Sequence, residues 1–200
     1  ELFNKLKYHQ PSILGENEFF KSAILIPFVE VDNEIHLLFE VRSMNMKRQP
    51  GDVCFPGGRI DKEDLSPAHC AIRETTEELG ITPKDITDVT PLDYVVSDMG
   101  RIIYPFVGKI TSTTALSPNP DEVGEVFTVP LEFFLQTEPE VYKVYFQVKP
   151  EENFPYDLIV GGKDYEWQMR HVNEHFYKYN GKVIWGLTAR ILNHLLKLLK

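Results

Sequence analysis

A single well-marked helix constrains most strongly how this chain of 200 residues can fold. Residues 55–58 read Phe-Pro-Gly-Gly, a combination that ends a strand and turns the backbone. Beyond them, Ser66 is a suitable N-cap, Pro67 suits the first helical position, and Gly80 suits the residue after the last turn. The pattern predicts a short strand, a glycine-rich connection and a helix that ends before Gly80.

This helix has one face that can pack against a core. Small, apolar or Thr side chains recur on it at helical spacing, at Ala68, Ala71, Ile72, Thr75 and Leu79. We expect this face to be buried.

Strand-like runs and further helices surround the marked helix. The runs occupy residues 22–31, 34–41, 52–55, 89–96, 102–110, 123–129 and 141–148. The first two runs predict a hairpin with Asp32 and Asn33 at its turn. Further helices are expected over residues 2–7, 130–136 and 186–200. Strands interleaved with helices predict an α/β or α+β sandwich, in one domain over residues 1–200.

The acidic balance of the chain argues against two classes of partner. There are 21 Lys and Arg residues against 30 Asp and Glu residues, for a net charge of −9. Binding to nucleic-acid phosphates or to an anionic membrane surface needs a basic footprint, so neither partner is expected. The longest apolar run, residues 23–29, is also too short to span a bilayer.

The termini and cysteines favour a cytoplasmic protein. The first ten residues carry charge throughout and show no apolar segment of the kind found in signal peptides. Cys54 and Cys70 are too few for a disulfide framework or a cysteine metal cluster. We expect both to be small buried side chains in a reducing compartment.

The acids of the marked helix lie at its unfavourable end. Glu74, Glu77 and Glu78 fall in the last two turns, where the helix dipole favours cations. Each like-charged pair three or four residues apart costs about 0.2–0.5 kcal/mol, and Arg73 offsets only part of this. Such a cluster is either a solvated acidic face or a site for a divalent cation, since hard cations bind converging carboxylate oxygens.

Residues 58–81, GRIDKEDLSPAHCAIRETTEELGI, resemble the Nudix box, the signature of hydrolases that cleave nucleoside diphosphates linked to another group. The second half, Arg-Glu-apolar-x-Glu-Glu-x-Gly-apolar, matches residues 73–81, with Thr75 in the apolar position. The first half departs from the pattern, because Asp64 replaces the usual Glu and eight residues rather than seven separate it from Arg73.

These departures are similar to the coenzyme A pyrophosphatase branch of the family. Residues 57–64 show its Gly-Gly-x-x-Asp-x-x-Asp arrangement, and residues 37–58, LLFEVRSMNMKRQPGDVCFPGG, resemble its upstream motif. Gln49 stands where that motif often has a histidine. Residues 117–135 and 184–192 also resemble the branch, so the likeness covers most of the chain.

The resemblance implies a fold and a reaction. The fold is an α/β/α sandwich with a central mixed sheet. The reaction is the metal-dependent hydrolysis of the pyrophosphate of coenzyme A or its derivatives, giving 3′,5′-ADP and 4′-phosphopantetheine or its acyl form. Mg²⁺ or Mn²⁺ would activate water and offset charge on the phosphates. A small-molecule nucleotide is the expected partner, and the oligomeric state is left open.

The resemblance also implies roles for the box residues. Glu77 and Glu78 correspond to the main metal ligands, Glu74 to a further ligand or to the group that orients the nucleophile, and the Gly58 carbonyl to an additional ligand. Arg73 is expected to hold the glutamates rather than to touch substrate. Asp61 and Asp64 are expected to be local caps and turn formers.

Two groups of residues outside the box complete the expected site. The general base is left open between a box glutamate and an acid of a later loop, Asp121, Glu122 or Glu125. Substrate binding is expected from the upstream motif, through Arg42, Ser43, Lys47 and Arg48. Basic side chains there suit the phosphates of coenzyme A.

Two other functions fit the same residues. One is hydrolysis of a different nucleoside diphosphate derivative, such as ADP-ribose or NADH, or of a nucleoside triphosphate. The other is a nucleotide-binding Nudix module without catalysis. The retained acids Glu74, Glu77 and Glu78 argue against the second, because a pure binder gains nothing from an unfavourable helix end.

Overall fold

The computed structural model describes residues 2–97, 100–111 and 116–200. The chain divides into two compact units, Glu1–Phe133 and Phe134–Lys200, each with its own sheet. No helix among the described residues is long and apolar enough to cross a membrane.

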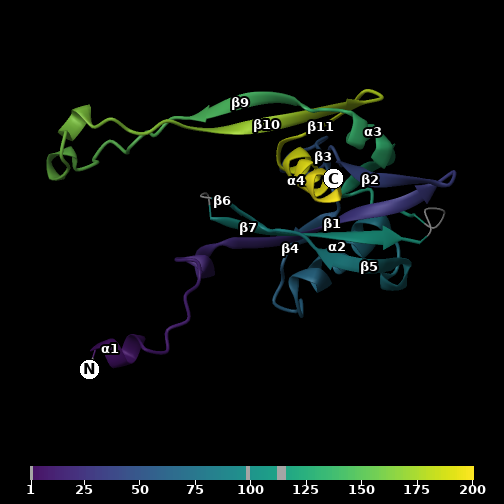
Figure 1. The fold of residues 1–200 in the computed structure, drawn as a ribbon, viewed down its shortest axis with the longest axis horizontal. Helices are drawn as coiled ribbons and strands as arrows, with labels where there is room; N and C mark the ends of the chain where they lie inside the picture. Colours follow the sequence, from purple (N-terminus) through teal and green to yellow (C-terminus); the bar gives the residue numbers. More distant parts are fainter. Residues whose placement is uncertain (1, 98–99, 112–115) are drawn as a thin grey trace. The chain divides into compact units, whose positions relative to one another are not determined.

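The first unit is built on a mixed sheet with β1 (Phe20–Val31) at its centre (Figure 1). β2 (Glu34–Arg42) pairs antiparallel with β1 on one side, and β7 (Arg101–Ile110) pairs parallel with it on the other. The main strand order is β3-β2-β1-β7-β5. This arrangement confirms the predicted α/β (α+β) class with a central mixed sheet.

Shorter strands extend this sheet. They are β3 (Val53–Cys54), β4 (Gly57–Arg59), β5 (Ile86–Pro91), β6 (Val95–Ser97) and β8 (Val123–Pro130). The predicted single strand over 89–96 is wrong, because β5 ends at Pro91 and a separate strand, β6, begins at Val95. The short helices are α1 (Leu2–Leu6) and α3 (Leu131–Gln136), with single helical turns at Glu16–Glu18 and Pro83–Asp85.

The predicted hairpin between β1 and β2 is confirmed. Val31 pairs with Glu34, so only Asp32 and Asn33 form the loop. Both have positive φ, 51° and 65°, a conformation that Asn and Asp tolerate better than other side chains. The turn fixes the register that places alternate residues of β2 on each face of the sheet.

The marked helix is α2 (Pro67–Leu79), with the predicted ends. The Ser66 hydroxyl accepts a hydrogen bond from the His69 N–H at 3.1 Å, and Gly80 takes up the left-handed conformation at φ 64°. Buried side chains of the helix pack against β1, β2 and β7, and this cluster includes Cys70, Ala71, Leu79, Ala23, Leu25, Leu38 and Phe106. The helix therefore covers one face of the sheet, with its acids beside the strands.

The glycines of the Pro-Gly-Gly segment are explained by the close pairing of two strands. It forms β4, which pairs antiparallel with β1 and places Gly57 opposite Ile24. A Cβ atom on Gly57 would collide with the Ala23 carbonyl oxygen, so only glycine allows this close approach. The segment was expected to be a turn that ends the preceding strand, and the strand β4 within it was not predicted.

The second unit contains a three-stranded antiparallel sheet of order β11-β10-β9 (Figure 1). Its strands are β9 (Glu140–Phe146), β10 (Arg170–Tyr179) and β11 (Lys182–Trp185), and short helical turns lie at Tyr156–Leu158 and Gly162–Asp164. The helix expected over residues 186–200 is α4 (Gly186–Leu199), which packs against β10 and β11 and buries Ile191, Leu192 and Leu195. That the whole chain acts as one domain stays a prediction.

Candidate active site

A bidentate ion pair between Arg73 and Asp64 anchors the middle of α2. Arg73 Nε and Nη2 donate to the two carboxylate oxygens of Asp64 at 3.0 and 2.9 Å. The Asp64 side chain has no solvent exposure, and it also accepts from the Asp61 N–H at 2.8 Å and contacts His69 Nδ1 at 3.0 Å. The hydrogen bonds from Arg73 hold the pKa of Asp64 well below its usual range.

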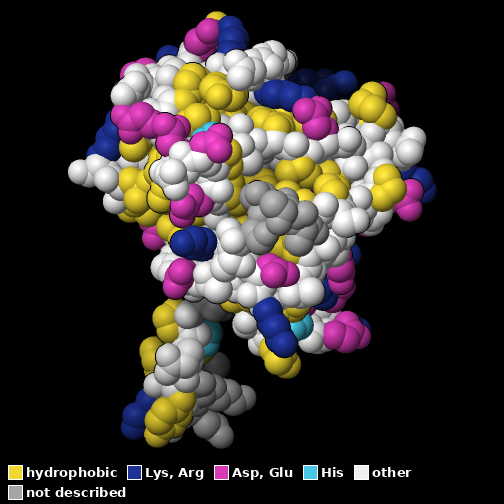
Figure 2. Space-filling view, turned by 90° about the vertical axis from the view of Figure 1, so that its right-hand side faces the viewer, with side chains coloured by type: hydrophobic (Ala, Val, Ile, Leu, Met, Phe, Trp, Pro, Cys, Tyr) yellow, Lys and Arg dark blue, Asp and Glu magenta, His cyan; other side chains and the backbone are white. Residues whose placement is uncertain are grey.

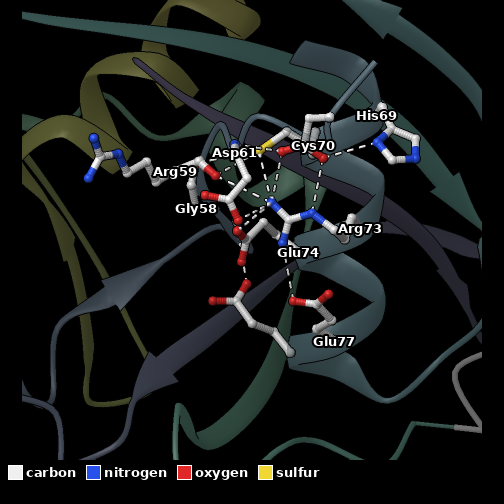
Figure 3. A network of polar contacts seen from close by, with 12 residues as sticks. Gly58, Arg59, Asp61, His69, Cys70, Arg73, Glu74 and Glu77 are labelled. Carbon is white, nitrogen blue, oxygen red and sulfur yellow. Dashed lines mark hydrogen bonds and ion pairs between the residues drawn. The ribbon is translucent and has the colours of Figure 1, made fainter. Parts of the chain in front are cut away.

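Arg73 also holds two of the box glutamates (Figure 3). Its guanidinium lies 3.0 Å from Glu74 Oε1 and 3.3 Å from Glu77 Oε2, and it donates to the Arg59 carbonyl at 3.3 Å. The hydrogen-bonding groups of the guanidinium are therefore bonded within the protein. The positioning role of Arg73 stays a prediction, and these contacts support it. Asp64, expected as a turn former, accepts from the Asp61 N–H, but its pairing with Arg73 was not expected.

Glu74 lies directly against the glycine strand β4. A Cβ atom on Gly58 would overlap the Glu74 carboxylate, so the acid closely approaches bare backbone there. The Glu74 side chain is 16% exposed, and burial raises the pKa of its carboxyl while Arg73 lowers it. The Gly58 carbonyl oxygen, an expected metal ligand, faces the Cys70 thiol at 3.7 Å.

Glu78 is the most enclosed of the box acids. The residue is 5% exposed, and its Oε2 accepts a hydrogen bond from the Gly57 N–H at 2.8 Å. Burial, and then the neighbouring charge of Glu40, raise the pKa of the Glu78 carboxyl. Glu77, by contrast, has a side chain that is 56% exposed.

Sequence reasoning missed Glu40, a second buried acid beside Glu78. The residue is 1% exposed near the C-terminal end of β2, and its Oε1 accepts from the Cys54 thiol at 3.4 Å. Its Oε2 is buried without a hydrogen-bond partner. Burial raises the pKa of Glu40, and the charges of Glu122 and Glu74 raise it further. A glutamate inside the apolar run LLFEV was the available signal.

The later loop contributes one acid to this group. The loop is tied to the end of α2, because the Asn119 N–H donates to the Glu78 carbonyl at 2.9 Å. Glu122 is half-buried, and its charge raises the pKa of Glu40, Glu74 and Glu78. Asp121 is exposed, and Glu125, expected on the same loop, is exposed on β8, where it pairs with Val41. We refer to Glu40, Glu74, Glu78 and Glu122 as the acid cluster.

The upstream motif meets the same loop at the end of β2. Ser43 is buried, and its N–H donates to the Glu122 carbonyl at 2.8 Å. Arg42 Nε donates to the Arg48 carbonyl at 3.3 Å, and the charge of Arg42 lowers the pKa of Glu40. Lys47 and Arg48 have exposed side chains. The structure brings Arg42 and Ser43 to the acid cluster and leaves Lys47 and Arg48 on the surface.

The residues present fit a divalent cation. As the side chains stand, no group of three or more His, Cys, Asp or Glu residues in the described part of the chain is arranged to hold a metal ion. However, the acid cluster supplies hard carboxylate oxygens, and Glu40 Oε2 is a buried acceptor without a donor. Buried like charges are costly without a counter-charge, which a divalent cation would provide.

Many acids outside this cluster lie on the surface. On the face drawn in Figure 2, Asp and Glu side chains are scattered among Lys, Arg and apolar side chains. The net charge of −9 therefore says little by itself about function. The informative acids are the buried ones.

Residues 20–151 match the family model described as NUDIX domain. The chain belongs to the Nudix family. The matched range contains α2, the strands of the mixed sheet and every candidate site residue discussed above. The predicted family is thereby confirmed.

Curated relatives include coenzyme A diphosphatases. The chain is 40% identical to the mouse peroxisomal coenzyme A diphosphatase NUDT7 over 131 residues, which are 66% of this chain and 53% of that protein. It is 32% identical to the human mitochondrial coenzyme A diphosphatase NUDT8, over 89% of this chain and 69% of the relative. A Nudix hydrolase of Pectobacterium atrosepticum, NudL, is also 32% identical, over 92% of this chain and 85% of that protein. The chain thus spans about half the length of the mouse relative.

A solved structure supports the fold. The match to the MutT/nudix family protein of Enterococcus faecalis covers 99% of this chain and 68% of that chain, with a TM-score of 0.53 and 14% sequence identity. This likeness concerns the fold alone. Family membership, rather than this neighbour, supports the predicted pyrophosphohydrolase class. Because the two coenzyme A relatives are named as peroxisomal and mitochondrial, a cytoplasmic location stays a prediction.

The ion pair at Asp64 yields a stability prediction. Asp64→Asn removes the charged acceptor of two Arg73 hydrogen bonds, and we expect the free energy of unfolding to fall by about 1.5–3 kcal/mol. Urea unfolding measures this change. The exposed Asp88→Asn, on β5, is the control. An unchanged midpoint for Asp64→Asn would show that the pair does not anchor α2.

The buried acids yield a pH prediction for the cation-free protein. Because the folded state raises the pKa of Glu40 and Glu78 above the ordinary 4.5, it binds more protons than the unfolded chain above that pH. Their contribution to stability therefore falls as pH rises from about 5 toward 8.

Thermal unfolding in EDTA across this pH range checks the sign. We expect Glu78→Gln to weaken the loss of stability with pH, and the exposed Glu63→Gln to leave it as in the wild type. A pH dependence identical in all three proteins would contradict the assignment of Glu78 as a destabilising buried acid.

Proposed function

We propose that this chain hydrolyses the pyrophosphate bond of coenzyme A or its derivatives, using Mg²⁺ or Mn²⁺. The products are 3′,5′-ADP and 4′-phosphopantetheine or its acyl form. The observation that carries the proposal is the acid cluster itself, held against glycine backbone beside a strand end that bears Arg42. The two coenzyme A diphosphatases among the relatives support the substrate class.

The cation site in this proposal uses the residues of α2 and β4. Glu74, Glu77, Glu78 and the Gly58 carbonyl would hold the divalent cation. When bound, it would lower the pKa of water and offset negative charge on the pyrophosphate. The Gly57 N–H bonds to Glu78, and Arg73 contacts Glu74 and Glu77, so these contacts keep the three carboxylates close to β4 and α2 before a cation binds.

Glu122 is our choice of general base among the loop acids. It lies near enough to Glu40, Glu74 and Glu78 for its charge to affect them, whereas Asp121 and Glu125 are exposed. A carboxylate beside the cluster could take the proton of the attacking water. The tie between Asn119 and the Glu78 carbonyl holds its loop at the end of α2.

The upstream motif would bind the phosphates of the substrate. Lys47 and Arg48 are exposed and free to reach an anion such as the 3′-phosphate of coenzyme A. Arg42 lies closer to the acids, and Ser43 shapes the loop through its bond to Glu122. A small basic group beside an acidic site would also attract an anionic nucleotide.

Product analysis tests the proposed reaction. The purified chain is incubated with coenzyme A, acetyl-coenzyme A, ADP-ribose, NADH and a nucleoside triphosphate, each with Mg²⁺ or Mn²⁺. We expect 3′,5′-ADP from the first two substrates. Glu78→Gln should lower turnover more than about 100-fold, because it removes a charged cation ligand, while Glu63→Gln should not.

Three outcomes would contradict the proposal or its cation site. Cleavage of ADP-ribose, NADH or a nucleoside triphosphate with coenzyme A left intact would assign a different nucleotide substrate. Binding of nucleotide without cleavage under any metal would assign a non-catalytic module. Unchanged turnover in Glu78→Gln would overturn the cation site.

A further inference from the structure

Glu40 occupies a position where a strand of the core normally carries an apolar side chain. It follows Leu37, Leu38 and Phe39, each with no exposed surface, near the C-terminal end of β2. An acid is rarely buried there unless it is paired or binds a cation. The residue therefore needs an explanation that the packing of β2 does not supply.

The side chain of Glu40 faces the catalytic helix. Leu38, two positions earlier, packs with Cys70 and Ala71 of α2, and side chains two apart on a strand share a face. Val126, the partner of Glu40 on β8, packs against the same cluster. Glu40 thus lies on the face of the sheet that α2 covers.

On that face, Glu40 lies among acids. Its charged neighbours are Glu74 and Glu78 from α2, Glu122 from the later loop and Arg42 from its own strand. Two cations lie near these four carboxyls. The Arg42 Nε is engaged by the Arg48 carbonyl, and the Arg73 guanidinium, which contacts Glu74, is also paired with Asp64. The local charge is therefore negative at the point where α2, β2 and the loop meet.

Only one of the two carboxylate oxygens of Glu40 accepts a hydrogen bond. Oε1 accepts from the Cys54 thiol at 3.4 Å, and burial raises the pKa of that thiol, which keeps it a donor. Oε2 is buried without a partner. A carboxylate kept only for packing would be expected to satisfy both oxygens.

We propose that Glu40 is an additional carboxylate of the cation site, with Oε2 available to the divalent cation on the side of Glu78. This inference rests on the proposed function, because it assumes a cation at the box glutamates. It adds a strand residue to the site and explains why β2 tolerates a buried acid. Cys54 becomes a positioning residue that holds Oε1 and leaves Oε2 free.

Direct titration of Mn²⁺ into the full chain tests this inference without any turnover. Isothermal calorimetry compares the wild type with Glu40→Gln, which keeps the shape and removes the charge. Glu34→Gln makes the same change at an exposed position of the same strand and is the control. We expect Glu40→Gln to weaken Mn²⁺ binding about 10-fold or more and Glu34→Gln to leave it unchanged.

Thermal unfolding in EDTA separates this role from a structural one. Removing one of several buried like charges should leave the cation-free Glu40→Gln protein as stable as the wild type, or more stable. Loss of stability with unchanged Mn²⁺ affinity would overturn the inference. If Glu40→Gln fails to fold, Glu40→Asp, which keeps the charge and shortens the side chain, decides in its place. Undiminished affinity in Glu40→Asp would then overturn the inference.

The failure of this inference is distinguishable from the failure of the proposed function. Equal Mn²⁺ affinity in the wild type and Glu40→Gln would overturn the role of Glu40 and leave the cation site intact. A wild type that does not bind Mn²⁺ would overturn both.

Discussion

The ion pair between Arg73 and Asp64 is the interaction on which the candidate site depends. It joins the middle of α2 to the connection that precedes the helix, and the same guanidinium reaches Glu74 and Glu77. Without it, acids of the same sign at the end of a helix would repel one another and turn into solvent. With it, Glu74 stays against the glycine backbone of β4.

Beside this ion pair, the site buries carboxylates, and the free-energy cost of burying them would be offset by a bound cation. Glu40 and Glu78 are buried in one region, and Glu74 is partly buried beside them. Taking several carboxylates out of water is unfavourable unless a cation or donors replace the water. The cation-free protein is therefore less stable than it would be without these buried charges. A divalent cation that binds only the folded state would raise its free energy of unfolding.

Local sequence signals predicted the parts of the fold that local chemistry determines. Ser66, Pro67 and Gly80 define the ends of α2, and Asp32 and Asn33 define a two-residue turn, because each acts through its own backbone. β4 was missed because its glycines carry no strand signal, and it forms only through pairing with β1. β10 was missed because most of its side chains are polar or exposed.

The candidate site shows the same division. The crowding of the box acids could be predicted because they follow one another along one helix, and the spacing of Arg73 to Glu77 predicted their contact. Glu40 could not be predicted as part of the site, because its proximity to Glu78 depends on how β2 and β3 pack beneath α2. Asp64, expected as a turn former, is also the bidentate partner of Arg73, nine residues away.

Anomalous scattering from crystals of the full chain grown with MnCl₂ tests the central claim most directly. The claim is that the acids of α2 exist to hold a divalent cation against the sheet. It predicts a manganese peak bounded by the carboxylates of Glu74, Glu77 and Glu78. A manganese peak elsewhere in the molecule, or no peak at these residues at saturating manganese, would contradict it.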